Sequence, residues 1–353
     1  MPYTLKEIAK RSEVSTATVS RVLNGRPGVA PKVRERVLAL VREMNAETGL
    51  DFRNHPPSAN SAIAFVVYFQ PDSDNPNKFT PPYNFYSKVM LGAEQELSSH
   101  GYHVVSSSIA EEHLADDNRG IPWLSQRRVD GMILCMPEAP GRVISSLVSS
   151  GLPSILVSDI RSHSWLDSVT SDDREGGYVA TRHLLEHGHR NIACLSGPEE
   201  WSVVGNRVQG YRDAMRDAGY EARIQFCRHV NLPSGSTSMP ELLTRWPDTT
   251  AVFATTDLLA IGASRVASET GRRLPDDLAI IGYDDIPWAE YADPPLTTLH
   301  IHTEEMGKLA ARRLLEILQN GRDVPVHIQV GNELVVRKSC GCNGLSTSKV
   351  LDS

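Results

Sequence analysis

The sequence predicts an α/β protein in which a small helical domain precedes a larger body of two lobes. Residues 4–44 show helical apolar spacing in three short segments, and from residue 62 onward apolar strand runs alternate with helical stretches. Such alternation indicates parallel sheets wrapped by helices. The alternating part is too long for one such sheet, so we expect two similar lobes.

The N-terminal helices are marked by capping and turn residues. Thr4 opens a capping box, and Ser15 suits the N-cap of a second helix over residues 16–23. Residues 24–28, NGRPG, predict a turn, and Pro31 suits the first position of a third helix. We therefore expect three short helices before residue 45.

The body shows apolar strand runs separated by helical stretches. The predicted strands are 63–69, 102–106, 129–135, 153–157, 191–195, 250–254, 278–282 and 334–337. The predicted helices are 84–99, 174–187, 206–218, 257–270 and 304–319. The predicted divisions are a helical domain at 1–45, a linker at 46–61, the two-lobe body at 62–340 and a tail at 341–353.

Charge is unevenly distributed along the chain. Residues 1–45 hold nine Lys or Arg and four acidic residues, a net charge of +5. The whole chain carries −7, which leaves −12 for the remainder. A basic head on an acidic body suits a polyanion-binding module joined to another domain, although an unevenly charged solvated surface would look the same.

The second predicted helix suits DNA reading. Two short helices joined by a tight turn, with small polar residues on the second, indicate a helix-turn-helix; a three-helix protein-interaction module is the alternative. Arg21 can bond guanine through two donors, and Ala17 and the Thr16 methyl can meet thymine methyls. The residues expected to contact bases or phosphates are Thr4, Ser15, Thr16, Ala17, Thr18, Ser20, Arg21 and Asn24.

The body offers polar residues where strands end. Asp284 follows the strand at 278–282, and Thr256 and Asp257 follow the strand at 250–254. Ligands of parallel α/β folds bind at this edge, and a polyhydroxylated ligand needs forked donors such as Arg207. Asp257 could instead cap its helix.

Other classes of protein are disfavoured. No apolar run is long enough for a membrane span and the N-terminus has no apolar signal region, so we expect a cytoplasmic protein. Five scattered cysteines do not form a disulfide framework. The chain shows no phosphate-binding loop, nucleophile elbow or dinucleotide fingerprint, so we expect no enzyme and no cofactor.

Two features could in principle hold a metal. His183 and His187 are spaced i, i+4, with His189 nearby, but no third ligand lies at motif spacing. Cys340 and Cys342 flank a glycine without partner ligands close in sequence. We therefore assign no metal site from the sequence.

Residues 14–24, VSTATVSRVLN, closely resemble the DNA-binding domain of the LacI/GalR family of bacterial regulators. The resemblance extends over roughly residues 3–340, through NFY at 84–86, GHR at 188–190, RVQGY at 207–211, ATTD at 254–257 and IGYDD at 281–285. It implies a body like periplasmic sugar-binding proteins, in which a small ligand binds between two lobes joined by three crossovers.

The resemblance also implies site residues and partners. The positions of Arg207 and Asp284 contact the effector in the family, Phe85 lies where a ring often lines the cleft, and Ser158 aligns with a usual aspartate. Trp201 falls where a purine-binding relative has arginine; it could stack on a ring or simply pack. The predicted effector-binding residues are Phe85, Ser158, Trp201, Arg207, Thr256, Asp257 and Asp284.

We thus expect a repressor that binds pseudo-palindromic operator DNA as a homodimer under the control of a sugar. Two alternatives remain: control by a protein co-regulator, and a small-molecule binding protein without operator function. The linker departs from the family, because His55 stands at the position of the leucine that wedges into the minor groove. Pro56, Pro57 and Gly49 also disfavour a hinge helix there.

Overall fold

The structure is a computed structural model that describes residues 5–23, 29–47, 61–69, 85–110, 129–136, 143–144, 147, 150–158, 166–199, 201–322 and 324–342. Thr4, Asn24, most of the predicted linker and nearly all of the predicted tail lie outside these residues. None of the described helices is long and apolar enough to cross a membrane. The chain divides into two compact units, the first formed by residues 1–170 and 303–328 and the second by residues 171–302 and 329–353.

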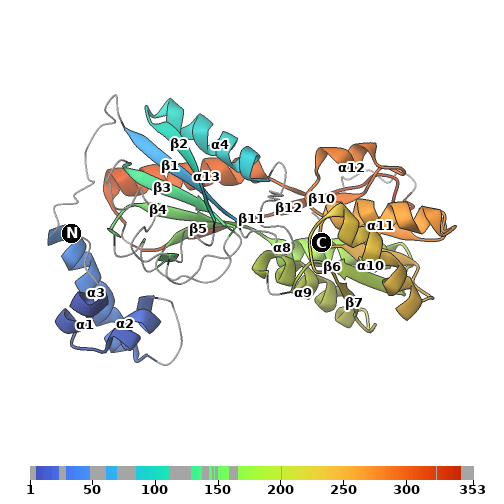
Figure 1. Ribbon diagram of the computed structural model, residues 1–353, viewed down its shortest axis with the longest axis horizontal. Helices are drawn as coiled ribbons and strands as arrows, with labels where there is room; N and C mark the ends of the chain where they lie inside the picture. The colour runs from blue at the N-terminus through green and yellow to red at the C-terminus, as the bar shows by residue number, and fades with distance from the viewer. Residues whose placement is uncertain are drawn as a thin grey trace. The chain divides into compact units, whose positions relative to one another are not determined.

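The N-terminal segment of the first unit contains three helices around its own core (Figure 1). They are α1 (Leu5–Arg11), α2 (Thr16–Leu23) and α3 (Pro31–Glu47), as the apolar spacing predicts, although α3 continues two residues past the expected end of the helical domain. Their core consists of buried aliphatic side chains at positions 8, 9, 19, 22, 37 and 41.

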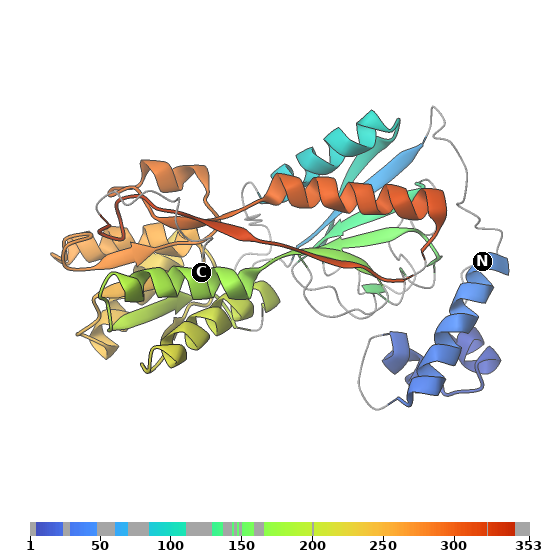
Figure 2. The ribbon, with the colours of Figure 1, turned by 180° about the vertical axis from the view of Figure 1, so that it is seen from behind.

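The rest of the first unit is built on a six-stranded sheet. Its order is β11-β5-β4-β3-β1-β2, and the pairs from β5 through β2 are parallel. Helices α4 and α13 pack against each other and lie along the sheet (Figure 2). The elements are β1 (Ala62–Phe69), α4 (Phe85–Ser99), β2 (His103–Ala110), β3 (Gly131–Cys135), β4 (Ser154–Val157), β5 (Asp167–Ser171), α13 (Thr303–Asn320) and β11 (His327–Val330).

The second unit contains a four-stranded parallel sheet of order β7-β6-β8-β9. Helix α8 packs against α9, and α10 packs against α11. Alternate strand residues, such as Leu195, Val252 and Ile280, form one core with α10 and α11. The elements are α8 (Asp173–Glu186), β6 (Ile192–Ser196), α9 (Ser202–Asp217), β7 (Arg223–Phe226), α10 (Leu232–Arg245), β8 (Ala251–Ala254), α11 (Asp257–Glu269), β9 (Ala279–Ile281) and α12 (Pro287–Tyr291).

A two-stranded antiparallel ribbon completes the second unit. It joins β10 (Thr298–Ile301) to β12 (Asn332–Val335). The chain passes from one unit to the other three times, after residues 170, 302 and 328. Parallel sheets wrapped by helices in two lobes are the architecture that the sequence pattern predicts, and the three passages are those that the family resemblance implies.

Candidate functional site

Helix α2 begins with a side-chain cap, as predicted. The Ser15 hydroxyl accepts a hydrogen bond from the backbone N–H of Thr18 at 3.0 Å and lies 2.9 Å from the Thr18 hydroxyl. The Ser15 carbonyl accepts from the N–H of Val19 at 3.0 Å. These bonds satisfy free groups at the helix start and fix where α2 begins relative to α1.

The two faces of α2 differ in character. Val19 and Val22 are fully buried in the helical core. Thr16, Ala17 and Arg21 are exposed, as is the capping Ser15, whereas Thr18 and Ser20 are half-buried. The exposed side chain of Arg21 lies on the same face of α2 as Ala17.

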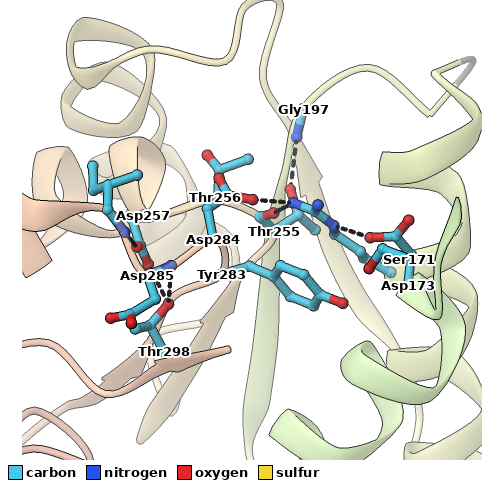
Figure 3. A network of polar contacts seen from close by, with 12 residues as sticks. Ser171, Asp173, Gly197, Thr255, Thr256, Asp257, Tyr283, Asp284, Asp285 and Thr298 are labelled. Atoms are coloured by element: carbon cyan, nitrogen blue, oxygen red, sulfur yellow. Dashed lines mark hydrogen bonds and ion pairs between the residues drawn. The ribbon is translucent and has the colours of Figure 1, made fainter. Parts of the chain in front are cut away.

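The second unit contains a buried arginine at the centre of a polar network (Figure 3). Arg207, on α9, is only 6% exposed. Its Nε donates to Asp173 Oδ1 at 2.8 Å, and its Nη1 donates to Asp284 Oδ1 at 2.9 Å and to the Thr255 carbonyl at 2.7 Å. The guanidinium carbon also lies 3.8 Å from the ring centroid of Tyr283. Helix α8, helix α9 and the ends of β8 and β9 therefore meet at one side chain.

Asp284 is the more open of the two carboxylates. Its side chain is 29% exposed, against 2% for Asp173. Burial raises the pKa of Asp284 to about 6, although Arg207 opposes the shift. Burial likewise raises the pKa of Asp173 against the opposing effect of Arg207. Asp284 thus forms an ion pair with Arg207 while part of its side chain stays exposed to solvent.

The loop that carries Asp284 has an unusual backbone. Asp284 has φ +110° and Asp285 has φ +50°, in the left-handed region that favours glycine. Each such residue costs about 1–3 kcal/mol and persists only where its surroundings hold it. Arg337 and His300 bond the Asp285 carboxylate at 2.8 and 2.9 Å, and these bonds lower its pKa although burial acts to raise it.

Asp257 forms hydrogen bonds that hold the same loop. It is fully buried and stands at the first position of α11, after the N-cap Thr256. Its Oδ1 accepts from the Thr298 hydroxyl at 2.5 Å and its Oδ2 from the Ile286 N–H at 2.8 Å (Figure 3). Burial, followed by the charge of Asp284, raises its pKa well above the usual range. Both oxygens are therefore occupied by the protein rather than directed outward.

The other predicted effector-binding residues lie after strands or, in the case of Phe85, at a helix start. Trp201 is half-buried at the N-cap of α9, just beyond β6, and Thr256 is buried at the end of β8. Phe85 and Ser158 belong to the first unit, where Phe85 begins α4 and is half-buried, and Ser158 follows β4 with φ +70°. The network of Arg207 includes Asp284 but not these four.

Sequence reasoning did not identify two members of the network. Asp173 is not among the predicted effector-binding residues, yet its carboxylate accepts from Arg207 Nε. Tyr283 packs under the guanidinium, and its hydroxyl accepts from Asn332 at 2.6 Å. A signal existed for Tyr283, since it lies beside Asp284, but none pointed to Asp173, whose preceding strand was not predicted.

Both the head and the body of the chain match known protein families. A family model described as bacterial regulatory proteins, lacI family, matches residues 4–46, and one described as a periplasmic binding protein-like domain matches residues 181–340. The chain is 33% identical over 344 residues to the HTH-type transcriptional regulator CelR of Thermobifida fusca, covering 95% of this chain and 98% of that protein. It is 31% identical over 340 residues to the repressor PurR of Proteus mirabilis, covering 95% and 96%.

A solved structure agrees with these matches. The transcriptional regulator CelR in complex with cellobiose superposes with a TM-score of 0.73 at 32% identity, over 96% of this chain and 99% of that one. A helix-turn-helix head followed by a two-lobed α/β body defines a class of DNA-binding transcriptional regulators rather than enzymes. The chain belongs to the LacI family of bacterial regulatory proteins, which confirms the resemblance seen in the sequence.

Proposed function

We propose that this regulator is a repressor whose operator affinity is controlled by a sugar bound at Arg207 and Asp284. The observation that carries the proposal is the buried Arg207, which holds a partly open carboxylate at the carboxyl ends of β8 and β9. The similarity to a regulator solved with cellobiose supports the same ligand class.

The chemistry of the pair suits a polyhydroxylated ligand. Among the described residues, Arg207 Nη2 has no hydrogen-bond acceptor, and Asp284 Oδ1 is the oxygen that Arg207 engages. Nη2 can therefore donate to one sugar hydroxyl while Asp284 Oδ2 accepts from its neighbour, since adjacent hydroxyls present both roles. Trp201, at the same strand edge, offers an apolar face on which a sugar ring can lie.

Two other candidate residues of the second unit, Thr256 and Asp257, act on the site through the fold. Asp257 holds the loop at residues 282–286, and Thr256 caps α11 by accepting from the Leu259 N–H at 3.4 Å. Their substitution would displace Asp284 rather than remove a ligand contact. We assign them to positioning, and Arg207, Asp284 and Trp201 to direct contact.

The exposed face of α2 is the proposed DNA reader. Its small side chains allow the helix into a major groove, where Arg21 reaches guanine while Ser15 and Thr18 lie near phosphates. We propose that two copies of the chain present two such helices to a pseudo-palindromic operator, with half-sites about one helical turn apart.

The test begins with selection of operator sequences by purified protein from a randomised duplex pool at two salt concentrations. We expect a pseudo-palindrome, and we expect Arg21→Ala to weaken binding to it by about 1–3 kcal/mol with little change on random DNA. Arg36→Ala, an exposed arginine on α3, is the matched control. Binding with a steep salt dependence but no selected sequence would contradict base reading.

The selected operator then serves to screen sugars for release. Cellobiose and other sugars are added to the complex of wild type, Asp284→Ala and Asp217→Ala, an exposed aspartate on the same unit as control. We expect Asp284→Ala to bind operator normally but to lose the sugar response. Full response in Asp284→Ala would place the ligand elsewhere.

A further inference from the structure

The end of helix α8 and the C-terminal turn of the described chain bring three metal-ligating side chains together. His183 lies in the last turn of α8, His187 is its C-cap, and Cys342 comes from a segment 155 residues further along the sequence than His187. One ligand atom from each residue lies within 4.8 Å of the other two. We propose that these three residues bind a zinc ion.

The geometry is close to that of a tetrahedral site. The His183 Nε2 atom lies 3.1 Å from Cys342 Sγ, and the two imidazole rings have centroids 4.3 Å apart. At zinc bond lengths of about 2.0–2.1 Å to nitrogen and 2.3 Å to sulfur, tetrahedral ligand atoms stand about 3.3–3.6 Å from one another. The observed separations therefore need only small side-chain rotations to hold the ion.

The orientation of His187 is already fixed by its own helix. Its Nδ1 atom lies 2.7 Å from the carbonyl oxygen of His183, so Nδ1 carries the proton and donates it. Metal-binding histidines are commonly oriented by such a bond, which leaves Nε2 with the lone pair for the metal. The i, i+4 spacing places both rings on one face of α8.

The turn at Gly341 separates two cysteines that have different environments. Gly341 has φ +76°, which turns the backbone between them. Cys340 is buried and accepts a hydrogen bond from the Thr297 hydroxyl at 3.2 Å, whereas Cys342 is half-buried beside α8. Cys342 alone is thus offered as the ligand, and Cys340 belongs to the core.

The ligand types select the metal. Two imidazoles and one thiol suit zinc, and no carboxylate belongs to the group, which disfavours magnesium and calcium. On binding, the Cys342 thiol releases its proton to solvent and the thiolate bonds the ion, while each imidazole keeps its one N–H. Three protein ligands leave a fourth position for water, and exposed His187 provides a route of entry. The ion would fasten the segment after β12 to α8.

The test uses full-length protein freed of any affinity tag. Zinc binding is measured by isothermal titration, and cobalt(II) serves as a spectroscopic probe, because a thiolate ligand adds a sulfur-to-cobalt charge-transfer band. We expect one ion per chain, a charge-transfer band, and a higher melting temperature with zinc. Cys342→Ser should abolish the band and weaken zinc binding by more than about tenfold. Even the loss of a residue that only orients a metal ligand lowers metal affinity by about 10–100-fold.

Two histidine variants show whether a loss of zinc binding is specific to the proposed ligands. His189→Ala, a neighbouring histidine outside the group, should bind zinc like wild type, whereas His187→Gln, at an exposed position, should weaken binding without disturbing the fold. Circular dichroism confirms folding of each variant. The proposal is overturned if wild type binds no stoichiometric zinc, or if Cys342→Ser or His187→Gln binds it as tightly as wild type.

Discussion

Replacement of Arg207 by alanine tests whether the polar network holds the second unit together. The substitution removes three hydrogen bonds, to Asp173, Asp284 and the Thr255 carbonyl. Asp284 can turn toward solvent, but Asp173 is 2% exposed and keeps no paired cation among the residues that the structure describes. The buried carboxylate therefore determines most of the cost.

The expected loss is large for one side chain. Removing one partner of a buried ion pair costs about 3–5 kcal/mol, and losing the contact with the Tyr283 ring adds about 0.5–2 kcal/mol. We therefore expect Arg207→Ala to lower the free energy of unfolding of the second unit by about 3.5–7 kcal/mol at pH 7. Urea denaturation measures this through the fluorescence of Trp201, Trp246 and Trp288, which all lie in that unit.

The direction of the pH dependence follows from the same carboxylate. Burial already raises the pKa of Asp173 from 3.8, and the loss of Arg207 removes the largest opposing effect, leaving the hydrogen bond with Tyr283 to act against the shift. The folded variant then binds a proton more tightly than the unfolded chain. Its stability should therefore rise as the pH falls from neutral through the raised pKa toward 3.8.

Two further variants decide whether the reasoning is right. Arg207→Met combined with Asp173→Asn removes both charges, so it should recover most of the stability that Arg207→Ala loses. Arg216→Ala removes an exposed arginine of the same helix and should leave the urea midpoint unchanged. A midpoint for Arg207→Ala equal to that of Arg216→Ala, or a double variant as unstable as the single one, would refute the argument.

Three other predictions concern the loop and the head. The pKa of Asp284, raised by burial to about 6, predicts that sugar affinity falls as the pH drops below 6 and the carboxylate loses an acceptor; titration calorimetry should show no such fall in Asp284→Asn. Gly282→Ala would place its Cβ against Asp257 Oδ1, so we expect loss of the sugar response with operator binding retained in mobility-shift assays. Glu13 lies between α1 and α2 with φ +53°, so Glu13→Gly should slow hydrogen exchange in the head and add up to about 1 kcal/mol of stability. Faster exchange in this variant would contradict the assignment of strain.

Apolar periodicity predicted the architecture because most strands of both sheets are apolar. It did not predict β5, whose five residues are all buried although four are polar. Much of this polarity is compensated inside the protein: Arg313 donates to Asp167 Oδ1 at 2.6 Å, and Ser171 donates to Asn332 at 2.9 Å. Arg322 Nε pairs with Asp167 Oδ2 at 2.7 Å by charge, without a well-aligned hydrogen bond. Such compensation involves residues more than 100 positions away, so a local pattern cannot reveal it.

The candidate site was predictable to the extent that it follows strand ends. Arg207 and Asp284 were expected to act together, and the structure joins them at 2.9 Å. Asp257 was expected near a ligand or at the start of its helix, and the structure places it at the first position of α11 with its carboxylate bonded to the Ile286 N–H. The zinc candidates were each discounted because His187 and Cys342 are distant in sequence, and only the fold shows their proximity.

The bonding of the loop bears on how a ligand could change operator affinity. Asp257 bonds the Ile286 N–H, Arg337 bonds Asp285, and the Asp284 N–H donates to the Leu299 carbonyl at 2.9 Å, so the loop is fixed by protein groups alone. A ligand that contacted only this preorganised loop would bind the operator-bound and free proteins equally, and equal binding shifts no equilibrium. Control therefore requires ligand contacts beyond the loop that differ between the two states. The sugar affinity measured with and without operator gives their free energy, because the same factor must separate the operator affinities with and without sugar.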